Sequence, residues 1–324
     1  MNVSQLEWIV TLGVTIAVLL FDVVYIGRRP HEPSMRECAI YLTIYICLAL
    51  AFGGWVWFSH GGRFGLEFFA GWLTEYSLSV DNLFLFMIVM ASFNVPKKYQ
   101  QQTLLVGIVL ALVFRGIFIA VGAVAINQFS WVFYIFGLFL IYTGLRLARD
   151  NDRGDDAENL VVRFARTHLS TTDRWAGLKL YVRDGSKRLM TPMFLVIVAL
   201  ATTDIVFALD SIPAIYGLTS EPYLVFAANV FALMGLRQLY FLLGGLLKRL
   251  VYLPQGLAVI LCFIGLKLLL HALHENKLPF INGGGYVDVP EIPTLASLGV
   301  IVLTLIVTTV ASLMKTGAGS SPRH

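Results

Sequence analysis

Two pairs of acidic residues stand inside hydrophobic stretches of this 324-residue sequence. Glu75 and Asp81 lie in one stretch, and Asp204 and Asp210 repeat the same spacing of six positions in a later one. An ionised carboxylate in hydrocarbon costs at least about 2.5 kcal/mol, so acidic residues in membrane segments usually serve a function. The two pairs are therefore the first candidates for chemistry in this chain.

Further oxygen donors accompany the acidic pairs, because Asn82 follows the first pair directly and Ser211 follows the second. Carboxylate, amide and hydroxyl oxygens suit Mg²⁺, Ca²⁺ or Mn²⁺. Neither motif contains His or Cys, which disfavours Zn²⁺ and Cu⁺. We predict a site for a hard divalent cation, formed by Glu75, Asp81, Asn82, Asp204, Asp210 and Ser211.

Arg115 and Arg237 are predicted charge partners of these acids. Four carboxylates and two guanidiniums leave two negative charges, which one divalent cation would neutralise. A carboxylate that is protonated when empty and ionised when it binds metal would also couple cation movement to protons. The alternative is structural, with Asp81 paired to Arg115 and Asp210 paired to Arg237. Glu67 either lines an outer vestibule or is solvated at the membrane interface.

The composition indicates a polytopic membrane protein. Hydrophobic residues make up 57% of the chain and charged residues only 14%, with a mean hydropathy of +0.76, whereas soluble domains carry about 25% charged residues. The three cysteines have no CxxC spacing, which argues against a disulfide framework or a zinc site. We interpret the uneven distribution of the net charge of +4 as a determinant of membrane topology, and we do not expect nucleic acid as a partner.

Nine stretches are long enough to span a bilayer, which takes about 20 residues each. They run from about 6 to 26, 38 to 58, 64 to 93, 103 to 126, 130 to 149, 191 to 217, 223 to 247, 255 to 274 and 294 to 314. The third and sixth carry the acidic pairs and are longer than one crossing needs, so a tilt or a break is expected in both. The predicted fold is all-α.

The distribution of Lys and Arg predicts the orientation. With the N-terminus outside and the C-terminus in the cytoplasm, 19 of the 24 basic residues lie in cytoplasmic segments. Only Arg63 and Lys277 lie outside, which agrees with the positive-inside rule. We expect a multi-pass protein of a bacterial inner membrane, in contact with the lipid bilayer.

The chain contains an internal repeat beyond the acidic pairs. Val113-Phe-Arg115-Gly116 matches Gly235-Leu-Arg237-Gln238, and Thr143-Gly144-Leu145-Arg146 matches Ile264-Gly265-Leu266-Lys267. Three spans therefore recur as three spans, and an odd number places the second unit upside down, as in secondary transporters. The predicted segments are 1–63 (two first spans), 64–149 (first unit), 150–190 (cytoplasmic loop), 191–275 (second unit) and 276–324 (outer turn, last span and tail).

Residues six apart in a helix cannot share one face, so each acidic span should have two polar faces. Glu75, Ser79 and Asn82 form one face of the third span, and Thr74, Ser77 and Asp81 form the other. In the sixth span Asp204 and Ser211 share one face, and Thr203 and Asp210 the other. Either these helices touch protein on both sides or they unwind locally, and Pro213 favours a distortion of the sixth span.

The motifs from Glu75 to Asn82 and from Thr203 to Pro213, with Phe114-Arg115-Gly116, resemble the TerC family of integral membrane proteins, named for tellurium resistance. The resemblance runs from about Phe64 to His274, and the added first spans are similar to the alkali-induced Alx-type branch. It implies export of a metal ion, most often manganese, and a role in resistance to metal or alkaline stress. A cavity lined by carboxylates would repel an oxyanion, which disfavours direct transport of tellurite.

We therefore expect an exporter of a divalent cation, with Mn²⁺ as the favoured cargo, alternating access and proton coupling. No enzymatic nucleophile, phosphate-binding loop or cofactor motif is present in the sequence, so neither an enzyme nor a bound cofactor is expected. The alternative is a membrane scaffold that assembles a stress-resistance complex through residues 150–190. A passive channel also fits these residues.

Overall fold

The computed structural model describes residues 1, 3–28, 34–129, 131–149, 172, 175, 179–184, 187–243, 250–274 and 287–318. Within these ranges the helices are α1 (Gln5–Arg28), α2 (Met35–His60), α3 (Gly62–Ser92), α4 (Lys97–Gln128), α5 (Val132–Arg149), α7 (Pro192–Tyr216), α8 (Pro222–Met234), α9 (Leu236–Leu243), α10 (Leu253–His274) and α11 (Thr294–Ala318). Two strands, β1 (Tyr181–Asp184) and β2 (Lys187–Met190), form an antiparallel pair.

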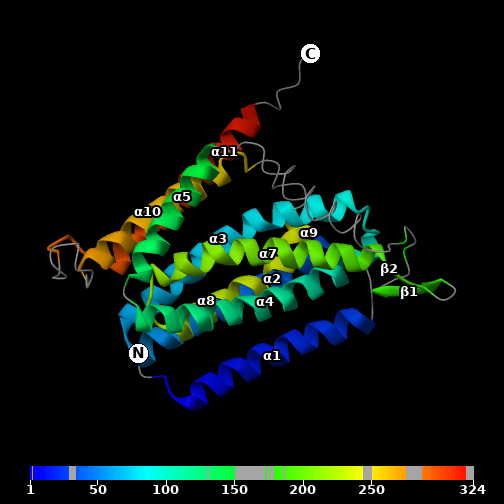
Figure 1. The fold of residues 1–324 in the computed structure, drawn as a ribbon, viewed down its shortest axis with the longest axis horizontal. Helices are drawn as coiled ribbons and strands as arrows, with labels where there is room; N and C mark the ends of the chain where they lie inside the picture. Colours follow the sequence, from blue (N-terminus) through cyan, green and yellow to red (C-terminus); the bar gives the residue numbers. More distant parts are fainter. Residues whose placement is uncertain are drawn as a thin grey trace.

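Eight helical segments of the described chain are long and apolar enough to cross a membrane, with α8 and α9 counted together as one. The 24-residue α1 adds a shorter apolar stretch, Gln5–Val18. In a bilayer an α-helix satisfies all of its backbone hydrogen bonds internally, which is why such apolar runs become helices. The predicted all-α polytopic architecture is confirmed, and the helices follow the predicted spans closely (Figure 1).

Local signals in the sequence fix several helix ends. Ser34 caps α2, its hydroxyl accepting a hydrogen bond of 3.2 Å from the backbone N–H of Glu37. Thr191 caps α7 in the same way, directly before Pro192 at the first helical position. A single residue, Gly61, separates α2 from α3 at a φ of 105°, a conformation that glycine adopts without strain. The last two of these signals set where the two acidic helices begin.

The third span is a continuous helix at the centre of the bundle. In Figure 1, α3 runs among α2, α7 and α8, and it also contacts α11. Both of its predicted polar faces are buried, one through Glu75 and Ser79 and the other through Thr74 and Ser77. Of the two explanations left open by the sequence, contact with protein on both sides therefore holds for α3.

Of the tilt or break expected in the two long acidic spans, the break does not occur, and the tilt stays a prediction. Both α3 and α7 are continuous, and Pro213 lies only three residues before the end of α7 at Tyr216, so it disturbs little more than the last turn. The interruption falls instead in the seventh span, where Gly235 separates α8 from α9. Glycine is a poor helix former in such a position, and this one also lies against Leu42 and Tyr76.

Helices of the two predicted units pair across the molecule. Contacts between Thr103 and Met193 at one end, and between Ile119 and Tyr216 at the other, show that α4 and α7 run parallel. In the same way α3 runs parallel to α8, and α5 packs antiparallel to α10 (Figure 1). Exchanging the two units would convert the α3–α8 pair into the α7–α4 pair. A two-fold rotation axis in the membrane plane that exchanges the two units would give this pattern of helix pairs. The inverted repeat itself stays a prediction.

The predicted loop 150–190 lies mostly outside the described residues. Its described part includes the β1–β2 hairpin, in which Tyr181 pairs with Met190 and Asp184 with Lys187. The hairpin leads directly to Thr191, the cap of α7, whose hydroxyl donates to the backbone carbonyl of Lys179 at 2.6 Å. This part of the loop therefore serves at least to anchor the start of an acidic helix.

Candidate functional site

Arg115 lies at the centre of a buried polar cluster. Its side chain, on α4, is 1% exposed. The Nε and Nη2 groups donate to the two carboxylate oxygens of Asp204 at 3.2 and 3.0 Å. Nη1 donates to Asn229 Oδ1 at 2.9 Å and forms an ion pair with Glu75 Oε1. We call Glu75, Arg115, Asp204 and Asn229 the Arg115 cluster.

Four helices bring this cluster together, since Glu75 lies on α3, Arg115 on α4, Asp204 on α7 and Asn229 on α8. One carboxylate comes from each predicted unit. Ser79, one turn after Glu75, donates to Glu75 Oε1 over 3.4 Å, so the buried face of α3 supports its own acid. The predicted polar face of α3 therefore turns towards the junction of the two units.

The cluster is electrostatically demanding. Buried ions cost several kcal/mol each unless their partners are well placed, and the planar guanidinium of Arg115 meets Asp204 in the two-bond arrangement that compensates best. Two carboxylates against one guanidinium leave one formal negative charge. Glu75 Oε2 and Asn229 Nδ2 are buried without a hydrogen-bond partner among the described residues. The cluster therefore still offers one acceptor oxygen and one donor nitrogen.

The other predicted ligands lie on the same two helices. Asn82 and Ser211 are buried, and Asp210 is half-buried. Asp81 belongs to α3, but its side chain lies outside the described part of the structure. In the described part, no three His, Cys, Asp or Glu side chains form a group that could hold a metal ion. Glu75 and Asp204 are engaged by Arg115 instead.

The structure places the two predicted charge partners in different surroundings. Arg115 pairs with Glu75 and Asp204 in the described part of the structure, whereas the side chain of Asp81, its partner in the structural alternative, lies outside that part, so that pairing stays a prediction. Arg237 lies on α9 beside a separate small cavity that Glu37 and Gln101 also line. Asn229 was not among the predicted ligands, and its buried position in an apolar helix was the signal that could have placed it in the site.

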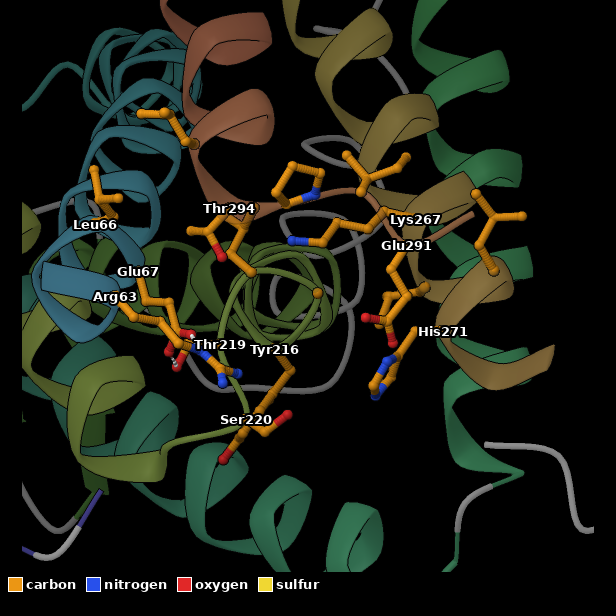
Figure 2. Close-up of a pocket in the computed structure, with 17 residues that line it drawn as sticks. Arg63, Leu66, Glu67, Tyr216, Thr219, Ser220, Lys267, His271, Glu291 and Thr294 are labelled. Carbon is orange, nitrogen blue, oxygen red and sulfur yellow. Dashed lines mark hydrogen bonds and ion pairs between the residues drawn. The ribbon is translucent and has the colours of Figure 1, made fainter. Parts of the chain in front are cut away.

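A larger cavity of about 600 Å³ is lined by the start of α3, the end of α7, α10 and the segment that leads into α11 (Figure 2). Its polar lining includes Arg63, Glu67, Thr219, Lys267, His271 and Glu291. Glu67 is 3% exposed and accepts hydrogen bonds from Arg63 Nε at 2.8 Å and from Thr219 Oγ1 at 2.7 Å. The structure thus places Glu67 in a cavity wall, and an outer vestibule at this place stays a prediction.

The cavity and the Arg115 cluster share two helices. Glu67 precedes Glu75 by eight residues on α3, a rise of about 12 Å at 1.5 Å per residue. Tyr216, in the cavity wall, follows Asp204 by twelve residues on α7, a rise of about 18 Å. The cavity therefore lies beyond the cluster along the same helices, towards one end of the bundle.

These spans and their buried charged centre define a multi-span integral membrane protein. Residues 60–319 match the integral membrane protein TerC family, so the chain belongs to that family, as its motifs indicated.

Several relatives match nearly the whole chain. An uncharacterized membrane protein of Mycobacterium tuberculosis is 48% identical over 317 residues, covering 96% of this chain and 80% of the relative. The Escherichia coli K12 protein named putative membrane-bound redox modulator Alx is 36% identical over 307 residues, 91% of each chain. A Myxococcus xanthus membrane protein is 35% identical over 309 residues, 95% of this chain and 92% of the relative. No solved structure matches the chain.

Proposed function

We propose that this protein exports a hard divalent cation, with Mn²⁺ as the favoured cargo. One observation carries the proposal: a carboxylate from each predicted unit, Glu75 and Asp204, is buried at a shared centre within the membrane span. In transporters built from inverted repeats the substrate site lies where the units meet. Oxygen donors at such a site favour hard cations over Zn²⁺ or Cu⁺.

In this proposal Arg115 is the resident counter-ion of the empty site. Its guanidinium pairs with both Glu75 and Asp204 while no cargo is bound and offsets one of their two negative charges. A divalent cation that enters between the units would compete with Arg115 for these carboxylates, and Asp81 and Asp210 would supply the further negative charge. Protonation of any of these acids in the empty state would couple release of the cation to uptake of protons.

We infer the orientation from the basic residues, with the N-terminus outside and the C-terminus in the cytoplasm of a bacterial inner membrane. The cavity that Glu67 lines would then face outwards, and the β1–β2 hairpin would lie on the cytoplasmic side. Cargo would pass from the Arg115 cluster towards this cavity along α3 and α7. The protein is proposed to act without enzymatic chemistry or a resident cofactor.

Flux measurements on purified protein in sealed vesicles test the proposal. We expect Mn²⁺ to cross with the wild-type protein, and Asp81→Asn and Asp210→Asn to lower the flux at least about tenfold, which corresponds to about 1.4 kcal/mol of lost stabilisation. Both substitutions leave the described Arg115 contacts in place. Asp288→Asn, which neutralises an exposed acid outside the spans, serves as the control and should retain full flux.

Two results would reject the exporter. If wild-type protein moves no divalent cation, or if folded Asp81→Asn and Asp210→Asn proteins transport as fast as wild type, the acids are not a transport route. The scaffold hypothesis would then be preferred, and stress resistance in cells should depend on residues 150–190 instead of the acids.

A further inference from the structure

Lys267 brings a positive charge to the wall of the outer cavity. It lies on α10, seven residues before the end of this helix, and its side chain is half-buried. Figure 2 shows the side chain extending from α10 across the cavity towards Thr294. No hydrogen bond or ion pair of Lys267 occurs among the described residues. A charged residue at such a depth is costly and is a functional candidate by default.

The carboxylates that face the cavity do not cancel this charge by direct contact. Glu67 is held by Arg63 and Thr219 on its own side of the cavity. Glu291 is 63% exposed and lies 3.6 Å from His274 Nε2. The cavity thus presents as many cationic side chains, Arg63 and Lys267, as carboxylates. A cation that enters the cavity would therefore meet the ammonium group of Lys267, and both carboxylates of the lining already have partners.

His271 is the remaining titratable group of the lining besides Tyr216. Its ring packs edge-on against Phe133 with centroids 5.0 Å apart, and it adds no negative charge in either protonation state. Tyr216 donates its hydroxyl proton to the backbone carbonyl of Ile119 at 2.7 Å. Neither side chain therefore offsets Lys267 for an incoming cation.

We propose that Lys267 sets the low cation affinity of the outer side, so that cargo leaves the outer cavity readily and re-enters it poorly. Lys267 is then a positioning residue for transport, since it acts through its field and does not ligate the cargo. A transported ion must be bound weakly enough to leave, and a fixed positive charge in a low-dielectric mouth serves this purpose. The inference rests on the proposed export function.

The repeat supplies a matched control. Arg146 corresponds to Lys267 in the aligned motifs of the two units, but it lies in the last turn of α5, at the opposite, cytoplasmic end. Replacing either residue by a neutral one removes one positive charge from equivalent positions of the two units. Only the change at Lys267 should alter the cation affinity of the outer cavity.

The test compares right-side-out and inside-out membrane vesicles that contain wild type, Lys267→Met, Lys267→Arg or Arg146→Gln. The readout is the Mn²⁺ concentration that gives half-maximal uptake on each face. For Lys267→Met we expect this concentration to fall at least about fivefold on the outer face and to stay within about twofold on the cytoplasmic face, since charge repulsion acts on the side where the charge lies. Lys267→Arg and Arg146→Gln should both resemble wild type on the outer face.

The outcomes separate the two proposals. If wild type transports Mn²⁺ but Lys267→Met leaves the outer half-saturation unchanged, the role of Lys267 is rejected and the export function stands. That role is rejected as well if Arg146→Gln changes the outer face as strongly as Lys267→Met does. If wild type moves no divalent cation, both proposals fail together. Lys267→Gln, a polar replacement, takes the place of Lys267→Met if the latter melts well below wild type.

Discussion

Replacing Arg115 by methionine is expected to lower the free energy of unfolding by about 3–5 kcal/mol, the usual cost of removing one partner from a buried ion pair. The substitution leaves Glu75 and Asp204 buried, close together and without their shared counter-charge. Asn229 would also lose the donor to its Oδ1 atom. Thermal and denaturant unfolding of the purified protein in detergent would measure the change.

A second variant distinguishes charge from packing in this prediction. Adding Glu75→Gln and Asp204→Asn to Arg115→Met removes the uncompensated charges while preserving side-chain volume, so more than half of the lost stability should return. Arg146→Met on α5, where the arginine is exposed, should change stability by no more than about 0.5 kcal/mol. Equal stability of the Arg115→Met and Arg146→Met proteins would contradict a buried counter-ion role for Arg115.

The sequence predicted the spans well because apolar length and charge decide them almost alone. It also predicted the buried faces: Glu75, Ser79 and Asn82 are buried together, as are Asp204 and Ser211. These faces follow from helical periodicity within one segment, which needs no knowledge of the neighbouring helices.

The partners of the acids could not be predicted in the same way. Arg115 pairs with Glu75 and Asp204 because of the way α3, α4 and α7 are rotated and packed together. This packing is a property of the whole bundle and cannot be read from one segment. The break at Gly235 was also missed, because a lone glycine does not predict whether a membrane helix continues. Pro213, in contrast, predicted a distortion of α7, but this helix continues past the proline to Tyr216.

The second large effect is expected where α5 crosses α10 at glycine residues. A Cβ atom at Gly265 would lie 2.7 Å from the carbonyl oxygen of Gly137, and one at Gly144 would lie 2.9 Å from the carbonyl oxygen of Ala258. Small residues at such crossings let two membrane helices approach closely. Because the obstructing atoms belong to the backbone, rotation of a side chain cannot relieve the clash.

Gly265→Leu should therefore destabilise the protein by at least about 1–3 kcal/mol, the usual cost of overpacking. Gly299→Leu is the control, because nothing lies within 4 Å of a Cβ atom at that position of α11. It should change the melting temperature little. The melting temperature of Gly265→Ala should lie between those of Gly265→Leu and Gly299→Leu, since this substitution adds only the clashing Cβ atom. If Gly265→Ala and Gly299→Ala melt at the same temperature, the α5–α10 crossing can widen freely, and it cannot be a rigid joint between the two units of the proposed transporter.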